Sequence, residues 1–583
     1  MRLQQLDILK VVSIIAIVLY HSGICGYGFL GVDVFLVLAG FFTAKSTLKS
    51  EMTGCKSIFS FISERVFRLL PLIIIAGAVC LLWGYNYMLP DDYENTAQSV
   101  VASNLFSNNY LQAHTTKFYW NISNLFRPLM HTWFVGLIMQ YYILVSIILL
   151  LVNKATIDLR WRKPLLILFI CVLTLVSLTL YCYETDESIK FYYLQYRFYE
   201  FGCGMMLFYL SKNKTAEGKS QLFPKTVYFL AYTSIAVLLF VDFEFVTPNI
   251  RRLITILVTT LLIWSILRKG ETSNASKFHT ILAKIGKASY SIFIWHQIVF
   301  ALTRYSFTIE IQACTPFAIS FTLISLLSWL SYHFVEKMKQ TQKTIIAFCT
   351  LFAITTTFSL YLYANAGVVR DVPELDITKS TAHRGLWAEY CDKGYCYDRD
   401  FSSSSMPKWL IIGDSFGRDF VNIIRESKIA DSVEISYSDL MTFADKVNRF
   451  QKADIVFISI NGFNEGHVSL INSYCTDNCR VIIIGEKNFG YTNGQIYRLS
   501  NRKDYHNTST KINESYHSRN KHFRTLYGEK FLDLLSFVTL TNGNVRVFTP
   551  DGHFISHDCS HLTRAGAKFY AERIDWDYFL LNK

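Results

Sequence analysis

Residues 8–25, ILKVVSIIAIVLYHSGIC, form an apolar run with Lys10 near its start and His21 near its end. The run is close to the ~20 apolar residues that a membrane-spanning helix needs. Arg2 precedes it as in a signal peptide, but no small-residue cleavage pattern follows and Gly28 opens a second apolar run. We therefore expect an uncleaved membrane helix at this end of the chain.

The composition extends this expectation to much of the chain. Of 583 residues, 51% are hydrophobic and only 17% are charged, whereas a soluble domain carries about 25% charged residues. Counting apolar runs of ~18 or more residues predicts eleven spans before residue 366. The predicted spans begin near Ile8, Phe29, Leu69, Leu129, Leu165, Leu194, Val227, Leu253, Ser289, Pro316 and Thr344.

The positions of Lys and Arg predict the orientation. If the N-terminus is inside, the inner loops hold 21 Lys and Arg residues and the outer loops hold six, as the positive-inside rule requires. The net charge of +12 is thus spread between apolar runs and does not indicate nucleic-acid binding. Eleven crossings place everything after residue 366 outside the cytoplasm.

The chain becomes polar after residue 366. Two close cysteine pairs, Cys391/Cys396 and Cys475/Cys479, permit disulfides and an oxidising compartment. Short apolar strands alternate with helical segments after residue 408, a pattern typical of a parallel sheet covered by helices. We predict a membrane domain at 1–340, an eleventh helix at 341–366, a linker at 367–408 and an α/β domain at 409–583.

Lys10 and His21 are the first candidate functional residues. Eleven residues correspond to about three turns, so the two face the same way, ~16 Å apart. An ionisable residue inside a membrane suggests a function, and His can exchange a proton near neutral pH. The alternative is that Lys10 reaches the inner headgroups and His21 lies at the outer interface.

Several motifs in the same order resemble acyltransferase family 3, a family of membrane O-acyltransferases, over about residues 5–340. They are Lys10-x10-His21, Asp33 within Gly31–Gly40, Arg65-x-x-Arg68, Pro128–Trp133, Arg197-x-x-Glu200, Ser289–His296 and Ser331–Glu336. The resemblance implies that Lys10 and His21 are catalytic. It also implies an acyl-coenzyme A donor, usually acetyl-coenzyme A, on the cytoplasmic side.

Some residues depart from the family or remain open. The family often has two Glu residues where this chain has Ile138 and Met139, so no acid role is expected there. We interpret His131 and His296 as structural residues that are hydrogen-bonded inside the bundle. Arg65 and Arg68, near Lys56, could hold the phosphates of coenzyme A. Alternatively, these arginines only determine topology.

The region after residue 408 contains a second set of motifs. A predicted strand ends in Gly413-Asp-Ser415 before a helix, which exposes the serine near a helix N-terminus. Asp558-x-x-His561 near the chain end could orient an imidazole that deprotonates a serine. His553, His557 and His561 recur every four residues and suggest metal binding as an alternative, but we expect no metal site.

With Gly462-Phe-Asn464, these motifs resemble the SGNH hydrolases over residues 409–583. The resemblance implies a flavodoxin-like, three-layer fold in which Ser415 is the nucleophile, His561 the base, Asp558 its orienting acid and Asn464 an oxyanion donor. The family's second glycine has no counterpart between Arg418 and Ile460. Another residue must therefore replace that backbone donor.

The two resemblances together predict a polytopic helical bundle fused to an SGNH-like domain. This is the arrangement of bacterial enzymes that O-acetylate surface glycans, so we expect a cytoplasmic (inner) membrane O-acyltransferase. Its partners would be acyl-coenzyme A, a surface glycan such as lipopolysaccharide, peptidoglycan or exopolysaccharide, and the bilayer, with no permanently bound cofactor. The alternatives are a tethered carbohydrate O-acetylesterase, and a transporter or flippase.

Overall fold

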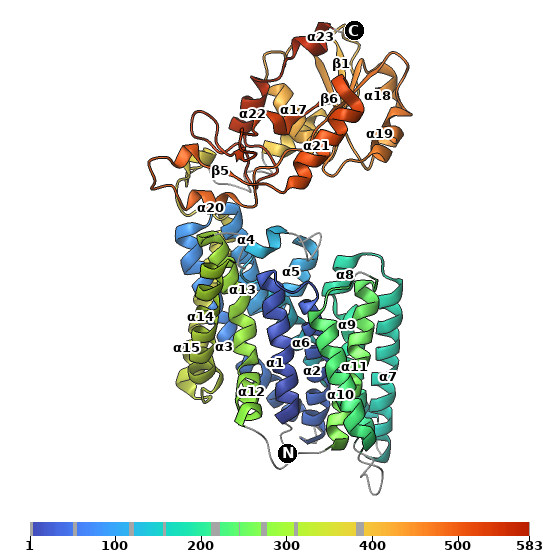
Figure 1. The fold of residues 1–583 in the computed structure, drawn as a ribbon, viewed down its shortest axis with the longest axis vertical. Coiled ribbons are helices and arrows are strands. Elements are labelled where there is room, and N and C mark those ends of the chain that lie inside the picture. The colour runs from blue at the N-terminus through green and yellow to red at the C-terminus, as the bar shows by residue number, and fades with distance from the viewer. Residues whose placement is uncertain are drawn as a thin grey trace. The chain divides into compact units, whose positions relative to one another are not determined.

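The computed structural model is shown in Figure 1. Contacts between residues divide the chain into two compact units, Met1–Asn86 with Asn95–Leu360 and Tyr87–Glu94 with Tyr361–Lys583. The structure describes residues 4–49, 55–115, 122–155, 159–211, 222–243, 245–269, 277–307, 313–380 and 390–581.

The first unit is helical, as the long apolar runs predict, and its main helices stand side by side (Figure 1). The boundaries of the two units fall within the residue ranges of α3, α4 and α15. The helices up to residue 364 are α1 (Gln4–Ser22), α2 (Gly31–Lys49), α3 (Cys55–Tyr87), α4 (Pro90–Asn104), α5 (Asn108–Thr115), α6 (Trp133–Ala155), α7 (Leu159–Tyr183), α8 (Glu187–Tyr192), α9 (Leu194–Ser211), α10 (Leu222–Phe240), α11 (Pro248–Lys269), α12 (Lys277–Lys287), α13 (Ser289–Ser306), α14 (Cys314–Ser331) and α15 (Gln342–Ala364).

Eight helices in the described part of the chain are long and apolar enough to cross a membrane. They are α1, α2, α3, α6, α7, α11, α14 and α15. The other three expected spans, beginning near Leu194, Val227 and Ser289, are helical as α9, α10 and α13 but do not fall in this group. The total of eleven therefore stays a prediction.

Close packing of α2 against α9 depends on two glycines. A Cβ atom on Gly40 would collide with the backbone carbonyl of Phe201, and one on Gly204 would collide with that of Val37. Small residues let membrane helices approach in this way. The contact brings the buried charges of the two helices together.

A buried group of charges joins α2, α9 and α11. Arg197 pairs with Asp33 and with Glu200, whose carboxylate accepts its Nε–H at 2.5 Å. Arg252 lies 3.5 Å from Asp33. All four side chains are at most 4% exposed. Since two cations meet two anions, the group is neutral overall, as charges inside a membrane bundle usually are.

The second unit contains a five-stranded parallel sheet of order β2-β1-β3-β4-β6. This order is found in flavodoxin-like sheets. Four of the strands lie where the apolar runs predict them, whereas β6 is only two residues long. The sheet strands are β1 (Lys408–Gly413), β2 (Glu434–Asp439), β3 (Ile455–Ser459), β4 (Arg480–Ile484) and β6 (Phe531–Leu532), and β5 (Ser509–Thr510) pairs with β7 (Val545–Arg546) in a separate ribbon.

Alternate residues of the strands bury opposite faces of this sheet. Trp409 and Ile411 of β1 belong to one core cluster, which includes residues of α17 and α22. Leu410 and Ile412 belong to another, on the side of α18, α19 and α21. The unit thus has three layers. Its helices are α17 (Ser415–Arg425), α18 (Val447–Lys452), α19 (Glu465–Asn472), α20 (Asn493–Tyr497), α21 (Glu514–Tyr527), α22 (Arg564–Ala571) and α23 (Asp577–Leu581).

The cysteines that the structure describes are all free thiols. Cys391 is buried with its thiol facing the Ser415 carbonyl, while Cys396 is exposed, so these two are not bridged. Cys475 and Cys479 lie within hydrogen-bonding reach of each other, and this hydrogen bond lowers the pKa of the Cys475 thiol.

Candidate functional sites

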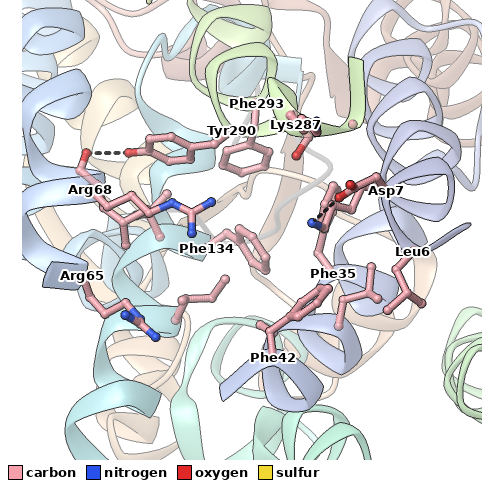
Figure 2. A pocket seen from close by; sticks show the side chains of 18 of the residues that line it. Leu6, Asp7, Phe35, Phe42, Arg65, Arg68, Phe134, Lys287, Tyr290 and Phe293 are labelled. Atoms are coloured by element: carbon pink, nitrogen blue, oxygen red, sulfur yellow. Dashed lines mark hydrogen bonds and ion pairs between the residues drawn. The ribbon is translucent and has the colours of Figure 1, made fainter. Parts of the chain in front are cut away.

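The first candidate site is a cavity of about 750 Å³ inside the first unit. It lies among α1, α2, α3, α6 and the segment from α12 to α13 (Figure 2). Asp7 is the one carboxylate among its described lining residues. The basic side chains that line it are Lys10, Lys45, Arg65, Arg68 and Lys287. An excess of cations in a partly enclosed space attracts an anionic ligand.

Arg65 and Arg68 are three residues apart on α3 and therefore share one helix face. Figure 2 shows both guanidinium groups reaching into the cavity from the side opposite Asp7. The Arg65 guanidinium donates to Ser46 Oγ at 2.8 Å. Lys10 Nζ lies 3.0 Å from Asp7 Oδ1 and 4.7 Å from the centre of the Phe42 ring. The arrangement offers planar donors suited to phosphate groups.

Aromatic side chains form another part of the cavity wall. Phe35, Phe42, Phe134 and Phe293 all line it, and the rings of Phe134 and Phe293 are 5.3 Å apart. The cavity thus combines a cationic region with an apolar one. Such a combination suits a ligand that has an anionic part and an uncharged part.

Three buried histidines, His21, His131 and His296, lie close to one another, and two of them are near Phe293. The rings of His21 and His296 are 5.0 Å apart, and those of His296 and His131 are 5.2 Å apart. Phe293 is 5.2 Å from His131 and 5.6 Å from His296. The backbone carbonyl of His21 accepts a hydrogen bond from Arg304. Phe293, which lines the cavity, is therefore a neighbour of two of the three histidines.

The structure places Lys10 and His21 in different surroundings, although both are on α1. Lys10 lines the cavity, whereas His21 is only 4% exposed and packs against His296. His296 Nδ1 lies 2.6 Å from the Phe293 carbonyl, so Nδ1–H is the donor and the position of the ring is fixed. This hydrogen bond agrees with the structural interpretation of His296.

The second candidate site lies in the second unit and contains the predicted serine, histidine and aspartate. Ser415 is the first residue of α17, directly after β1 and the helix cap Asp414. His561 Nε2 lies 2.8 Å from Ser415 Oγ, and His561 Nδ1 lies 2.7 Å from Asp558 Oδ2. With Nδ1–H donating to Asp558, Nε2 can accept the serine proton.

The loop around Asp558 is fixed by further hydrogen bonds. The other carboxylate oxygen accepts the backbone N–H groups of Ser560 and His561 at 3.0 and 2.8 Å. Desolvation alone would raise the pKa of Asp558, but the hydrogen bonds from His561 and Ser560 lower it to about 2. Asp558 is therefore ionised at neutral pH. Asn493 Nδ2 holds the same loop by donating to the carbonyls of Ser556 and His557.

A buried ion pair supports the histidine from the other side. Lys487 Nζ lies 2.8 Å from Asp419 Oδ2, and both side chains are 1% exposed. The same oxygen accepts the backbone N–H of Leu562, next to His561, at 3.1 Å. Asp419 is one turn after Ser415 on α17. The pair thus connects the helix of the serine to the segment of the histidine.

Of the two predicted oxyanion donors, only the Asn464 side chain has a group that can donate in this structure. Asn464 caps α19 by accepting the His467 N–H on its Oδ1, which leaves its amide Nδ2 as the group that can donate. Its loop starts beside the serine, because the Asn461 N–H bonds to Asp414. The turn after β2 is where a second backbone donor would lie. There the N–H groups of Leu440, Met441 and Thr442 all bond to other protein atoms, so none replaces the missing glycine in this conformation.

The histidines spaced four apart do not converge. His553 pairs with Asp376 at 3.1 Å, while His561 bonds to Ser415 and Asp558. No group of three or more His, Cys, Asp or Glu side chains in the described part of the chain is placed to hold a metal ion.

Comparison with known families identifies the first unit. A family model described as "Acyltransferase domain" (Acyl_transf_3) matches residues 3–364. The chain belongs to this acyltransferase family. Together with the apolar helices, the match shows that it is a multi-pass membrane protein and an acyltransferase.

Curated relatives agree with this assignment. The "Putative membrane-bound transacylase BcsY" of Komagataeibacter xylinus is 26% identical over 341 residues, which are 58% of this chain and 82% of BcsY. The "Peptidoglycan O-acetyltransferase OatA" of Listeria monocytogenes is 26% identical over 349 residues, 57% of this chain and 54% of OatA. The chain thus matches about half the length of OatA. No solved structure matches the chain significantly.

The acyltransferase cavity shows where this chain departs from the family pattern. Ile138, at one of the two positions where the family often has Glu, lines the cavity, and Met139 is buried. Asp7 is therefore the one carboxylate among the described residues that line the cavity, and it is paired with Lys10. Neither Asp7 nor Lys287 was predicted from the sequence as a site residue.

The residues that support the Ser415–His561–Asp558 triad were also missed. Asn493, Asp419 and Lys487 are far from each other in the sequence and occur in no recognised motif. One signal was available for Lys487, because it follows β4 by three residues. Side chains at the carboxyl ends of parallel strands gather at one edge of the sheet.

Proposed function

We propose that this acyltransferase moves an acyl group, most simply acetyl, from cytoplasmic acyl-coenzyme A to a hydroxyl of an extracytoplasmic glycan. The observation that carries the proposal is the occurrence in one chain of two sites. The membrane unit has a cationic cavity with Lys10, Arg65 and Arg68, and the second unit has a hydrogen-bonded Ser415–His561–Asp558 chain.

The cavity supports acyl-coenzyme A as the donor substrate. The phosphates of coenzyme A would bind Arg65 and Arg68, whose planar donors match phosphate oxygens. The thioester and acyl chain would lie toward Phe134 and Phe293, near the three histidines. Lys10 would supply a fixed positive charge. His21 would take the proton of the hydroxyl that attacks the thioester carbonyl, the C–S bond would break, and coenzyme A would leave as its thiol with that proton. The protein would keep no permanently bound cofactor.

The second unit would act as an SGNH-like transferase. Ser415 Oγ loses its proton to His561 Nε2 and bonds to the carbonyl carbon of the incoming acyl group, and the leaving group departs with that proton. A sugar hydroxyl then attacks the acyl-serine, His561 accepts the hydroxyl proton, and Ser415 is regenerated with it. Asn464 Nδ2 would donate to the oxyanion in both steps.

The proposed location is a bacterial inner membrane, with eleven spans, the N-terminus inside and the second unit outside. The loop charges support this orientation. The name of OatA specifies peptidoglycan as the acceptor of that relative. For this chain we propose the broader class of cell-envelope glycans, which includes peptidoglycan, lipopolysaccharide and exopolysaccharides.

A second candidate function is carbohydrate O-acetylesterase activity. The short Ser415–His561 and His561–Asp558 distances favour it, because the same three groups would hydrolyse an ester if water replaced the sugar hydroxyl.

The test uses membranes from cells with and without the protein, together with isotope-labelled acetyl-coenzyme A. A transferase releases coenzyme A and labels the glycan, as seen by mass spectrometry of isolated envelope polysaccharides. An esterase instead removes acetyl groups from the glycan and leaves acetyl-coenzyme A intact. Unlabelled glycan together with unchanged acetyl-coenzyme A would exclude the proposal.

A further inference from the structure

A second cavity of the membrane unit, about 760 Å³ in volume, forms a groove along α1, α12, α13 and α14. Its floor and walls are mostly apolar and include Ile14 and Val18 of α1, Ile292 of α13 and Phe321 and Ile324 of α14. It shares Lys287 with the first cavity, the proposed site of acyl-coenzyme A, but its other lining residues are different. An apolar groove on a membrane bundle suits a hydrocarbon chain.

One end of this groove is cationic. Lys284 and Lys287 are both in the last turn of α12, and Lys337 follows the π-helix after α14. No carboxylate is among the described residues that line the groove. The neighbouring Glu336 is occupied elsewhere, because it accepts the backbone N–H of Ser291 at 3.1 Å. Three cations with no acid between them complement a phosphate group.

The groove also contains a polar group without a partner. Ser328 of α14 lines it and is 3% exposed, and its Oγ makes no hydrogen bond within the described structure. A buried hydroxyl without a hydrogen-bond partner is unfavourable. An ester or carbonyl oxygen of a ligand in the groove would accept a hydrogen bond from this hydroxyl.

The backbone next to the cationic end is unusual. Residues Tyr332–Glu336 form a short π-helix directly after α14. π-helices are rare, and short ones occur frequently at functional sites. Here the π-helix places Tyr332 and His333 in the groove lining and leads to Lys337, whose Nζ lies 4.3 Å from the Tyr332 ring centre.

The length of the groove fits one leaflet of a bilayer. Along α14, from Phe321 to Tyr332, the wall extends for ~17 Å at 1.5 Å per residue. Half of a hydrocarbon core is ~15 Å thick. A single acyl chain whose headgroup sits at the lysines would therefore fill the groove.

We propose that this groove is a binding site for an anionic glycerophospholipid of the surrounding bilayer. The lipid phosphate binds Lys284, Lys287 and Lys337. An ester oxygen accepts a hydrogen bond from the Ser328 hydroxyl, and one acyl chain lies between α1 and α14. The site is separate from the acyl-coenzyme A site, and Lys287 is the one residue that contributes to both.

The test measures phospholipid binding by the purified full-length protein without any acyl-coenzyme A. Protein reconstituted with equal amounts of phosphatidylglycerol and phosphatidylcholine is extracted, and the retained lipids are counted by native mass spectrometry. We expect one retained phosphatidylglycerol per protein. In Lys284→Gln/Lys337→Gln, retention should fall at least tenfold, because each lysine near a lipid phosphate contributes about 1 kcal/mol.

The matched control is Lys339→Gln/Lys343→Gln, which removes two exposed lysines that do not line the groove. It should retain lipid as the wild type does. Ser325→Phe fills the groove without changing its charge and should also reduce retention, which gives a second measurement if the double lysine variant does not fold. Equal retention in all variants, or equal loss in the control, would overturn the lipid site.

Repeating the measurement with added acyl-coenzyme A distinguishes this site from the acyl-coenzyme A site. Arg65→Gln/Arg68→Gln should keep the phospholipid but bind acyl-coenzyme A weakly, whereas Lys287→Gln should weaken both. If acyl-coenzyme A did not bind at all, the lipid result would be unaffected.

Discussion

The two candidate sites differ in how complete they are without a substrate. In the second unit, Ser415, His561 and Asp558 already form a continuous hydrogen-bonded chain with distances of 2.8 and 2.7 Å. In the membrane unit, Lys10 lines the cavity while His21 packs against His296. A triad on a rigid sheet edge can be preformed in the free protein. His21 is not among the described residues that line this cavity.

Removing His21 is the test of this difference between the two sites with the largest expected effect. His21→Ala should reduce acyl transfer from acyl-coenzyme A by about 10²–10⁴-fold, the usual contribution of a general base. Hydrolysis of an activated ester by the Ser415–His561–Asp558 triad should be unchanged. Rates are measured on purified protein, and membrane insertion is checked by fractionation. His114→Ala, at an exposed histidine of α5, is the control and should keep both activities. If His21→Ala transferred the acyl group at the wild-type rate, His21 would have only a packing role.

The second test concerns the arginines of the cavity. Arg65→Gln/Arg68→Gln should raise the KM for acyl-coenzyme A about 10–100-fold, because two charge-assisted contacts to phosphate are lost. The hydrolytic activity of the second unit should not change. Steady-state kinetics measure both. Lys339→Gln/Lys343→Gln removes the same charge outside the cavity, and an equal rise in its KM would mean that only the general surface charge attracts the donor.

The third test asks what keeps the Ser415–His561–Asp558 triad preformed. Asp419→Asn leaves Lys487 buried without its anion, and losing one partner of a buried pair costs about 3–5 kcal/mol. We expect a lower unfolding temperature of the second unit and about tenfold slower ester hydrolysis. Asp419→Leu/Lys487→Met removes both charges and should regain stability but not activity, because Leu562 still lacks its acceptor. Asp577→Asn breaks an exposed pair with Lys428 and should change neither.

The smallest expected effect is a pH dependence of stability in the triad loop. Burial lowers the pKa of His557 to about 4 from its ordinary value of 6.5. The unfolded chain therefore binds a proton first as the pH falls, so stability is complete above pH 6.5 and declines down to pH 4. The decline is at most about 3 kcal/mol. His557→Gln should flatten this part of the curve in thermal unfolding of the full-length protein; an unchanged slope would assign the acid sensitivity to other groups.

The comparison also shows what the sequence could predict. The strand, turn and helix around Ser415 and the Asp558-x-x-His561 loop are local patterns, and the sheet topology brings their ends together. The meeting of His21, His131 and His296 depends on how separate helices pack, which no short motif encodes. Lys287 was missed for the same reason, and β6 is too short to give a periodic signal. The span count differs at α9, α10 and α13, whose helices are short or polar.

The most direct test of the two-site account is Ser415→Ala in sealed, inside-out membrane vesicles given labelled acetyl-coenzyme A. If the membrane unit transfers the acyl group to the outer triad, glycan labelling in Ser415→Ala should fall as far as it does in His21→Ala. The double variant should be no worse than either single variant, because steps in one pathway are not additive. If Ser415→Ala labels the glycan at the wild-type rate, the membrane unit must acylate the acceptor by itself and the account is wrong.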